Sequence, residues 1–281
     1  MLSSTKRDAA TKAVITILLA AIGCIMIYPF LWMISVSLER TANVALPFPP
    51  RFIPELFSWF NYGLVFENNA LFLAYGNSTF LACVHVAMSI ASALLGGYAF
   101  SRGSFKGKRI LYIAVLATMM IPFETRLIPM FTMFNDLGLI NTKYPLILPS
   151  IIDALGLVLA KQYFDQLPEG LRESAKMDGA GEFKTYFFIF VPLTGPITAT
   201  LAILAFQESW NSFIWPLVVI NDQHLKTVPL FLSSFSAENG DRLAGVTMAL
   251  TAMSIMPILL VFIFFQKYII RSVALSGLKG E

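Results

Sequence analysis

Two long runs without a charged side chain constrain this chain more than any other feature. Ala13–Leu38 and Asn68–Ser101 contain no Asp, Glu, Lys or Arg. Each exceeds the roughly 20 residues that an apolar helix needs to cross a hydrocarbon core of about 30 Å. The composition agrees, because 57% hydrophobic and 13% charged residues are typical of a membrane protein. The sequence predicts an all-α membrane protein with six transmembrane helices. The other four spans are expected at Ile110–Phe134, Tyr144–Phe164, Pro192–Ile220 and Ala244–Lys267.

The basic side chains predict how these spans are oriented. With the N-terminus inside the cell, fourteen of the 20 Lys and Arg residues fall in cytoplasmic segments and six in outer ones. Basic residues near spans collect on the cytoplasmic side, so both the N- and C-termini are expected to be cytoplasmic. The net charge of +3 then reflects topology and gives no reason to expect nucleic acid as a partner. The expected organisation is a cytoplasmic tail 1–12, a transmembrane domain 13–267 and a cytoplasmic tail 268–281.

A charged segment that contains glycine separates the fourth and fifth predicted spans. Pro168 is expected as the first residue of a short helix, with Glu173 in its early turns and Lys176 near its end, as the helix dipole favours. Gly179 is expected to stop that helix, because glycine accepts the left-handed conformation of a helix end. Residues 167–190, called the 167–190 loop below, therefore predict two short helices joined by a sharp turn. The alternative is an ordinary amphipathic helix at the membrane surface.

The 167–190 loop resembles the EAA loop of importer permeases in the ATP-binding-cassette (ABC) family. The family pattern is Glu-Ala-Ala, then a Gly at fixed spacing, then Ile-x-Leu-Pro. Here Ser174 replaces the first Ala of the pattern and Val191 replaces the Leu. The resemblance implies that the loop places a coupling helix in a groove of a separate ATPase subunit. The matching residues are Glu173, Ala175, Gly179, Ile189 and Pro192, and the implied ATPase-coupling residues are Glu173, Ser174, Ala175, Asp178 and Gly179.

The fifth span carries a second resemblance, to permeases of the carbohydrate class that contains maltose-type systems. Residues 210–217 read Trp-Asn-Ser-Phe-Ile-Trp-Pro-Leu and are similar to the span-five signature of that class. Met120-Ile121-Pro122 and the loop at 137–142 also resemble it. The resemblance implies a multi-pass subunit of a bacterial cytoplasmic membrane, in contact with lipid. Its implied partners are a second homologous permease, two ATPase subunits and an extracytoplasmic solute-binding protein.

The chain contains no phosphate-binding loop of the form Gly-x-x-x-x-Gly-Lys-Ser/Thr. We therefore expect a transport subunit with no catalytic residue and no cofactor of its own, while ATP and Mg²⁺ are used by the partner ATPase subunits. Cys24 and Cys83 fall inside predicted spans, where neither a disulfide nor a metal site is expected.

Ionisable side chains inside spans are costly to bury and usually mark a cavity or pathway. Counted at about 1.5 Å per residue along their spans, four of them fall in the central-to-outer part of the bilayer. Asp153 and Glu208 are expected to line a polar cavity, while Arg126 balances part of their charge. An ion pair of Arg126 with a carboxylate, or an interfacial position for Arg126, is the alternative. The four residues are Glu124, Arg126, Asp153 and Glu208.

Polar side chains also gather on one face of the fifth span. Gln207, Glu208 and Asn211 share this face by their spacing. Carboxylate and amide groups beside an indole ring suit a sugar, because they bind its hydroxyls while the ring covers its C–H surface. Pro216 is expected to permit a kink here, and the outer aromatic belt is an alternative place for Trp210 and Trp215. The residues expected along the substrate path are Asp153, Gln207, Glu208, Trp210, Asn211 and Arg126.

Small residues in the second span predict a close helix contact. Ser89, Ala93 and Gly97 repeat at four-residue spacing, which lets a neighbouring backbone approach. His85 lies in the same span and is expected to be a neutral, hydrogen-bonded histidine and not a proton relay.

Together these features predict a permease subunit of an ATP-driven, binding-protein-dependent ABC importer that forms half of the path for a sugar or related polyhydroxylated solute. One alternative keeps the ABC assignment but changes the cargo to a phosphorylated polyol or an amino acid, with Arg126 binding the anion. The other is an ion-coupled secondary transporter in which Asp153 and Glu208 carry protons or sodium.

Overall fold

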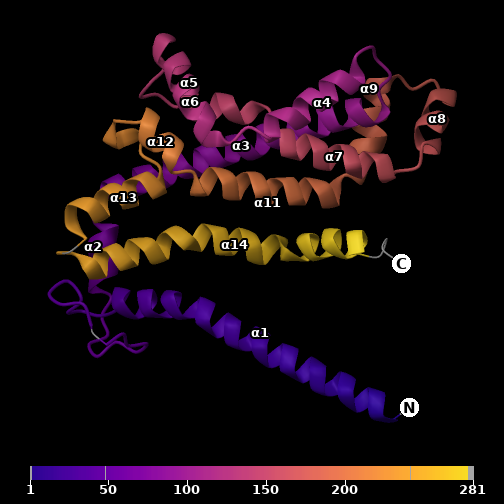
Figure 1. Ribbon diagram of the computed structural model, residues 1–281. Helices are drawn as coiled ribbons and strands as arrows, with labels where there is room; N and C mark the ends of the chain where they lie inside the picture. The colour runs from indigo at the N-terminus through magenta and orange to yellow at the C-terminus, as the bar shows by residue number, and fades with distance from the viewer. Residues whose placement is uncertain (1, 48, 241, 278–281) are drawn as a thin grey trace. The chain divides into compact units, whose positions relative to one another are not determined.

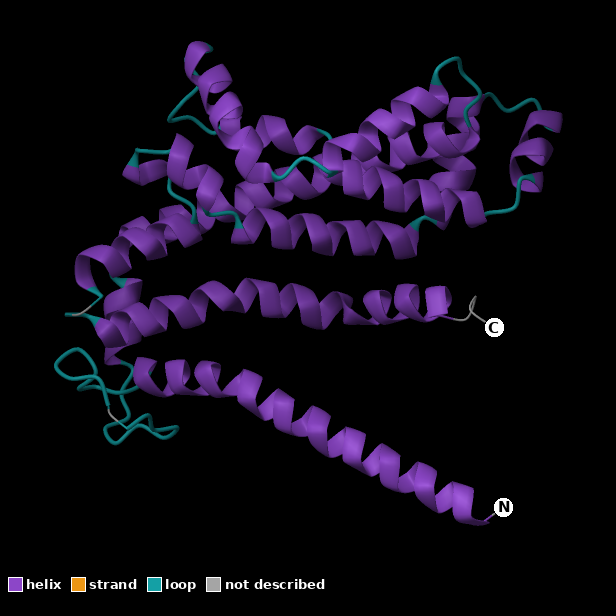
Figure 2. Ribbon diagram, viewed as in Figure 1, coloured by secondary structure: helices purple, strands orange, loops and turns teal. Residues whose placement is uncertain are grey.

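The computed structural model describes residues 2–47, 49–240 and 242–277, and every regular element within them is a helix (Figures 1 and 2). The expected all-α class is confirmed. The chain forms two compact units. One contains the chain up to Asn69 together with Leu232–Met256, and the other contains Ala70–Phe231 together with the chain from Pro257.

The longer helices have the following bounds. They are α1 Leu2–Ser37, α2 Phe60–Phe66, α3 Asn69–Arg102, α4 Lys108–Met119, α5 Phe123–Asp136, α7 Ala154–Gln166, α8 Gly170–Met177, α11 Gly195–Asn211, α12 Ile214–Val219, α13 Val228–Asn239 and α14 Ala244–Gly277. The short elements are α6 Tyr144–Ile147, the 3₁₀ segments η1 Leu148–Ile151 and η3 Gln223–Leu225, α9 Glu182–Thr185, the π-helical segment η2 Tyr186–Phe190 and α10 Val191–Leu193.

The described chain carries as many as six candidate membrane spans. Four helices are long and apolar enough by themselves, namely Thr11–Ser37, Asn69–Arg102, Tyr144–Gln166 and Ala244–Phe265. Two further bent pairs of helices pass the same criterion, which brings the number to six if each pair is one span. Many of their apolar side chains are exposed, as an apolar solvent around the helices would allow.

In the first unit, an asparagine pair organises the segment after α1. The amide of buried Asn61 donates to the carbonyl oxygens of Ser37 (3.0 Å) and Glu39 (2.9 Å) and accepts from Asn43 (2.7 Å). Asn43 in turn accepts from the backbone N–H of Gly245 (2.9 Å), which satisfies a free donor at the start of α14. The proline-rich part of this segment is non-helical, and the helix α2 follows it.

In the second unit, α3 and α7 pack through small residues. A Cβ added to Gly97 would lie only 2.6 Å from the Cβ of Ala160. One added to Gly156 would lie 3.1 Å from the Cβ of Ala93. The expected close contact is therefore confirmed, and α7 is the partner. The small-residue seam consists of Ser89, Ala93 and Gly97 on α3 with Gly156 and Ala160 on α7 and Asp153 at the N-cap of α7.

The third and fifth predicted spans are not continuous helices, which corrects their expected form. The chain bends by 100° between α4 and α5, where Pro122 adopts an extended conformation and has no N–H to continue the helix. It bends by 78° between Glu182–Leu193 and α11. The prediction of a kink at Pro216 is also wrong. The helix breaks earlier, because α11 ends at Asn211, and Pro216 lies inside the next helix, α12.

Candidate functional site: the 167–190 loop and a polar face of α11

The turn in the 167–190 loop depends on one glycine. Gly179 has φ +75°, a left-handed conformation that glycine adopts without a steric cost. Its N–H donates to the carbonyl of Lys176 (3.0 Å), and the N–H of Ala180 donates to that of Ala175 (2.9 Å). This pair of hydrogen bonds is the Schellman motif that ends many helices. The expectation that Gly179 stops the helix is confirmed, whereas α8 begins at Gly170 and not at Pro168.

The base of the loop is packed into the second unit. Ala175 of α8 is only 3% exposed, and Tyr186 and Phe190 are buried. Phe190 lies in one core cluster with residues of α3, α7 and α11, among them Tyr98 and Phe164. Burying an aromatic ring of this size contributes about 2–3 kcal/mol, so the end of the loop is held firmly to the helices beneath it.

Charged side chains tie the two short helices of the loop together. Arg172 on α8 donates to Glu182 on α9 (2.7 Å) and to Glu169 (3.2 Å). The hydrogen bond to Glu182, with desolvation opposing it, raises the pKa of the Arg172 guanidinium above its usual value, so this cation stays charged. The Tyr98 hydroxyl of α3 also donates to Glu182 (3.2 Å), and the Arg102 guanidinium pairs with Glu169. The loop is therefore fixed both internally and to the end of α3.

The outer face of the loop is exposed and partly apolar. Met177 is 89% exposed and Phe183 is 79% exposed, although both lie in an otherwise charged segment. Four of the five predicted coupling residues are exposed with them, while Ala175 faces inward. Exposed apolar side chains on a rigid, polar segment are typical of a protein contact site. The exposed four are Glu173, Ser174, Asp178 and Gly179.

The structure leaves the expected polar face of α11 open. Gln207, Glu208 and Asn211 are exposed, and the Glu208 side chain is 74% exposed. Trp210 is only 3% exposed and stacks on Phe206 with ring centroids 5.5 Å apart. Trp210 therefore supports this face from behind and does not present its ring beside the amides.

His85 of α3 lies beside this face. Nε2 of His85 is 3.8 Å from a carboxylate oxygen of Glu208, and the His85 side chain is 15% exposed. No sequence pattern predicted this contact, because only the folded chain brings α3 beside α11. Trp215, assigned alternatively to the aromatic belt, is buried and donates to the carbonyl of Pro145 (2.8 Å).

The remaining two path candidates do not join the others. Asp153 is the N-cap of α7, where its carboxylate accepts from the N–H of Gly156 (2.7 Å) and from the hydroxyl of Ser89 (2.5 Å).

Arg126 is exposed on α5 beyond the bend. Among the described residues Arg126 forms no ion pair, so the alternative in which it pairs with a carboxylate is not formed. The described part of the chain also has no cluster of His, Cys, Asp and Glu that could hold a metal ion.

These helices, bent spans and anchored loop define a membrane-transport subunit, and comparison with known proteins gives its family. Residues 86–275 match the family described as "binding-protein-dependent transport system inner membrane component". The chain belongs to this family. It is thus a multi-pass permease of the cytoplasmic membrane and part of an ABC importer, which sets the ion-coupled carrier aside.

Individual relatives cover nearly the whole chain. The arabinooligosaccharides transport system permease protein AraQ of Halalkalibacterium halodurans is 34% identical over 268 residues, which is 95% of this chain and 96% of that protein. The trehalose/maltose transport system permease protein MalG of Thermococcus litoralis is 32% identical and covers 98% of this chain and 100% of its own length. A chain of a bacterial ABC transporter that imports the acidic polysaccharide alginate has the same fold, with a TM-score of 0.82, 24% identity and coverage of 93% and 97%.

Proposed function

We propose that this subunit forms half of the translocation path for a sugar or a related polyhydroxylated solute. Two features support this cargo. Relatives at 34% and 32% identity are named for arabinooligosaccharides and for trehalose and maltose. The exposed carboxylate and amides on α11 are of the kind that bind hydroxyl groups. A phosphorylated polyol would need a cation on this face, whereas Arg126 lies beyond the bend on α5.

The 167–190 loop is proposed to couple this path to ATP use. In this proposal the loop faces the cytoplasm, with tails 1–12 and 268–281 on the same side of the membrane domain 13–267. Two ATPase subunits bind ATP and Mg²⁺, and α8 sits in a groove of one of them. The observation that carries the proposal is a pair of short helices that exposes Met177 and Phe183 while its base is buried and ion-paired, because such a segment transmits displacement without bending.

Each path residue then has a distinct proposed role. Glu208, Gln207 and Asn211 contact the solute, and Trp210 holds their helix in place. Asp153 fixes the start of α7, and Arg126 on α5 stays outside the solute site. A second homologous permease completes the path, and an extracytoplasmic solute-binding protein delivers the solute to the outer loops, which include residues 221–243.

Isolation of this chain with its partners in mild detergent tests the coupling proposal. A tag on the chain is expected to recover an ATPase and a second permease. Glu173→Lys combined with Gly179→Pro is expected to lose the ATPase and keep the permease. Glu67→Lys is the matched control, because Glu67 is an exposed carboxylate outside the loop. Loss of the ATPase from both variants, or from neither, would contradict the assignment of the loop.

A second experiment tests the path on α11. Glu208→Gln removes the charge and keeps the shape, so uptake of the sugar is expected to fall about tenfold, as for one lost hydrogen bond to a charged group. Recovery of the ATPase should not change. Glu124→Gln is the control, since Glu124 is an exposed carboxylate on α5. Uptake by Glu208→Gln at the rate of the unchanged protein would remove Glu208 from the path.

A further inference from the structure

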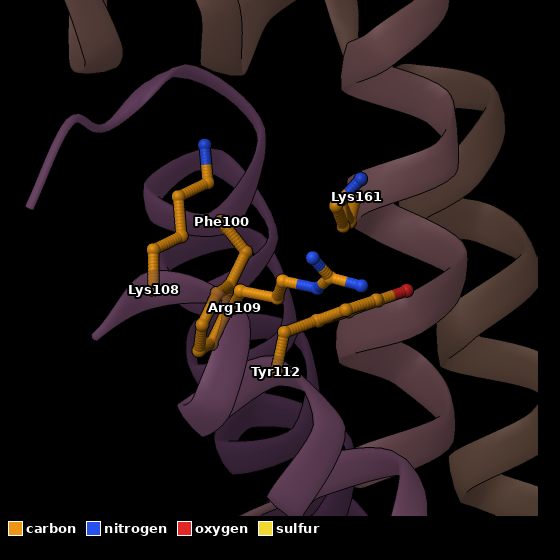
Figure 3. A pocket seen from close by; sticks show the side chains of 5 residues that line it. All are labelled: Phe100, Lys108, Arg109, Tyr112 and Lys161. Carbon is orange, nitrogen blue, oxygen red and sulfur yellow. The ribbon is translucent and has the colours of Figure 1, made fainter. Parts of the chain in front are cut away.

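A cavity with a cationic rim lies where α3 ends, α4 begins and α7 passes. Its volume is about 250 Å³, and it is called the basic pocket here (Figure 3). In Figure 3 the guanidinium of Arg109 extends toward Lys161 and the Tyr112 ring. The basic pocket is lined by Phe100, Lys108, Arg109, Tyr112 and Lys161. None of these residues belongs to the 167–190 loop or to the polar face of α11.

The pocket carries an excess of positive charge. Lys161 pairs with Asp165 (2.6 Å), so one of its three cations already has a carboxylate partner. Lys108 donates to the carbonyls of Ser101 (3.1 Å) and Gly103 (2.9 Å), which are neutral groups. Arg109 is exposed, and the described residues provide no ion pair for it. Two positive charges therefore remain available to an anion.

The interior of the pocket is apolar. The rings of Phe100 and Tyr112 lie 5.5 Å apart, and Nζ of Lys161 lies 5.2 Å from the centroid of Tyr112. Immediately beyond the pocket, Ile110 and Ile113 of α4 are exposed. The cations thus lie where an apolar, exposed helix begins, which is the level of the lipid headgroups. A soluble anion would gain nothing from the ring walls, whereas a lipid would use both the walls and the cations.

We propose that the basic pocket binds the headgroup of an anionic phospholipid. The phosphate lies against Arg109, the exposed cation of the rim, with Lys108 as the second cation beside it, and the glycerol and upper acyl carbons lie against Phe100 and Tyr112. Basic pockets between transmembrane helices bind such headgroups in other membrane proteins. The inference requires only that the chain is in a membrane, and it does not depend on the proposed cargo. With both termini cytoplasmic, as proposed above, the site faces the cytoplasmic leaflet.

Native mass spectrometry of the delipidated, assembled transporter tests this site, with phosphatidylglycerol as the titrated probe. Arg109→Gln is expected to weaken the tightest binding about fivefold, the effect of one basic residue near a membrane surface. Lys106→Gln is the matched control, because Lys106 is an exposed cation of the same loop that does not line the pocket. Equal weakening by both substitutions, or none by Arg109→Gln, would overturn the proposal.

A photoreactive phosphatidylglycerol gives a result that requires no variant. On the unchanged protein it is expected to label the segment that contains Arg109 and Tyr112, and excess inorganic phosphate should not prevent the labelling. Displacement by inorganic phosphate would show a simple anion site and overturn the lipid assignment. Loss of the ATPase from Arg109→Gln with unchanged lipid labelling would assign the pocket to a protein partner instead.

Discussion

The small-residue seam and the 167–190 loop are held in place by opposite means. In the seam, Gly97 and Gly156 let two helices touch, so side-chain volume sets the distance between them. In the loop, an added Cβ on Gly179 would meet no atom within 4 Å, and the geometry instead depends on a left-handed glycine and on ion pairs. The seam should therefore respond to side-chain volume, and the loop to backbone conformation and charge.

The largest effect is expected when volume is added to the seam. Gly97→Leu places its Cβ 2.6 Å from that of Ala160 and 2.8 Å from the backbone nitrogen of Lys161, so α3 and α7 must separate. Overpacking of this kind costs about 3 kcal/mol, and a lower midpoint of thermal unfolding in detergent would show it. Gly76→Leu in the same helix is the control, because a Cβ there meets nothing within 4 Å. Equal midpoints for the two variants would mean that the seam does not hold the fold.

The next effect is a loss of transport without a loss of fold. Gly179→Pro removes a donor and demands φ near −65° where the chain has +75°, so the end of α8 must change direction. If α8 relieves this strain by leaving its native position, a cost of about 3 kcal/mol corresponds to roughly a hundredfold loss of uptake. The unfolding midpoint should then change little, because the buried base of the loop at Phe190 is untouched.

Two further variants of the loop separate backbone conformation from side-chain size. Gly179→Asn should keep part of the uptake, because asparagine tolerates the left-handed region. Gly181→Ala should keep all of it, since Gly181 has φ −71° and open space around it. Full uptake by Gly179→Pro would show that the turn does not transmit the ATPase motion.

The sequence predicted these two regions well because each depends on local residue types. Small residues repeating every fourth position have few other uses in a span. A glycine after a short charged helix has a known place in helix ends. The sequence did not predict which proline breaks a helix. Pro122 does, whereas Pro29, Pro129 and Pro257 remain inside helices, because the freed carbonyl can be satisfied by neighbouring groups that only the folded structure supplies.

The same limit applies to the path residues. Their depth was counted along continuous helices, but α7 begins only at Ala154, so Asp153 became a helix cap. His85 gained a partner because the folded chain brings α3 beside Glu208 of α11. The helical spacing predicted that Gln207, Glu208 and Asn211 share one face of α11. That Trp210 is buried behind this face follows from tertiary packing, which the spacing does not reveal.

A smaller effect is expected at the polar end of the seam. Asp153→Ala removes the cap of α7 and the acceptor for Ser89, which should lower the free energy of unfolding by about 1–2 kcal/mol. Asp153→Asn should lower it much less, because asparagine also caps helices. Denaturant unfolding in detergent measures both. If Asp153→Ala left stability unchanged but reduced uptake, Asp153 would belong to the path and not to the seam.

The smallest expected effect is in the ion pair that joins the two helices of the loop. Arg172→Gln and Glu182→Gln each remove one partner of a contact that is partly open to water, so their coupling in a double-mutant cycle should be about 1 kcal/mol or less. Hydrogen exchange of α8 is the sensitive readout, because the bond restrains this helix locally while buried Phe190 holds the base of the loop. Raising the salt concentration should speed exchange in the unchanged protein and have less effect in the double variant. A coupling near zero would mean that packing at Ala175 and Phe190 fixes α8 alone, and the contrast between the loop and the seam would then be one of degree.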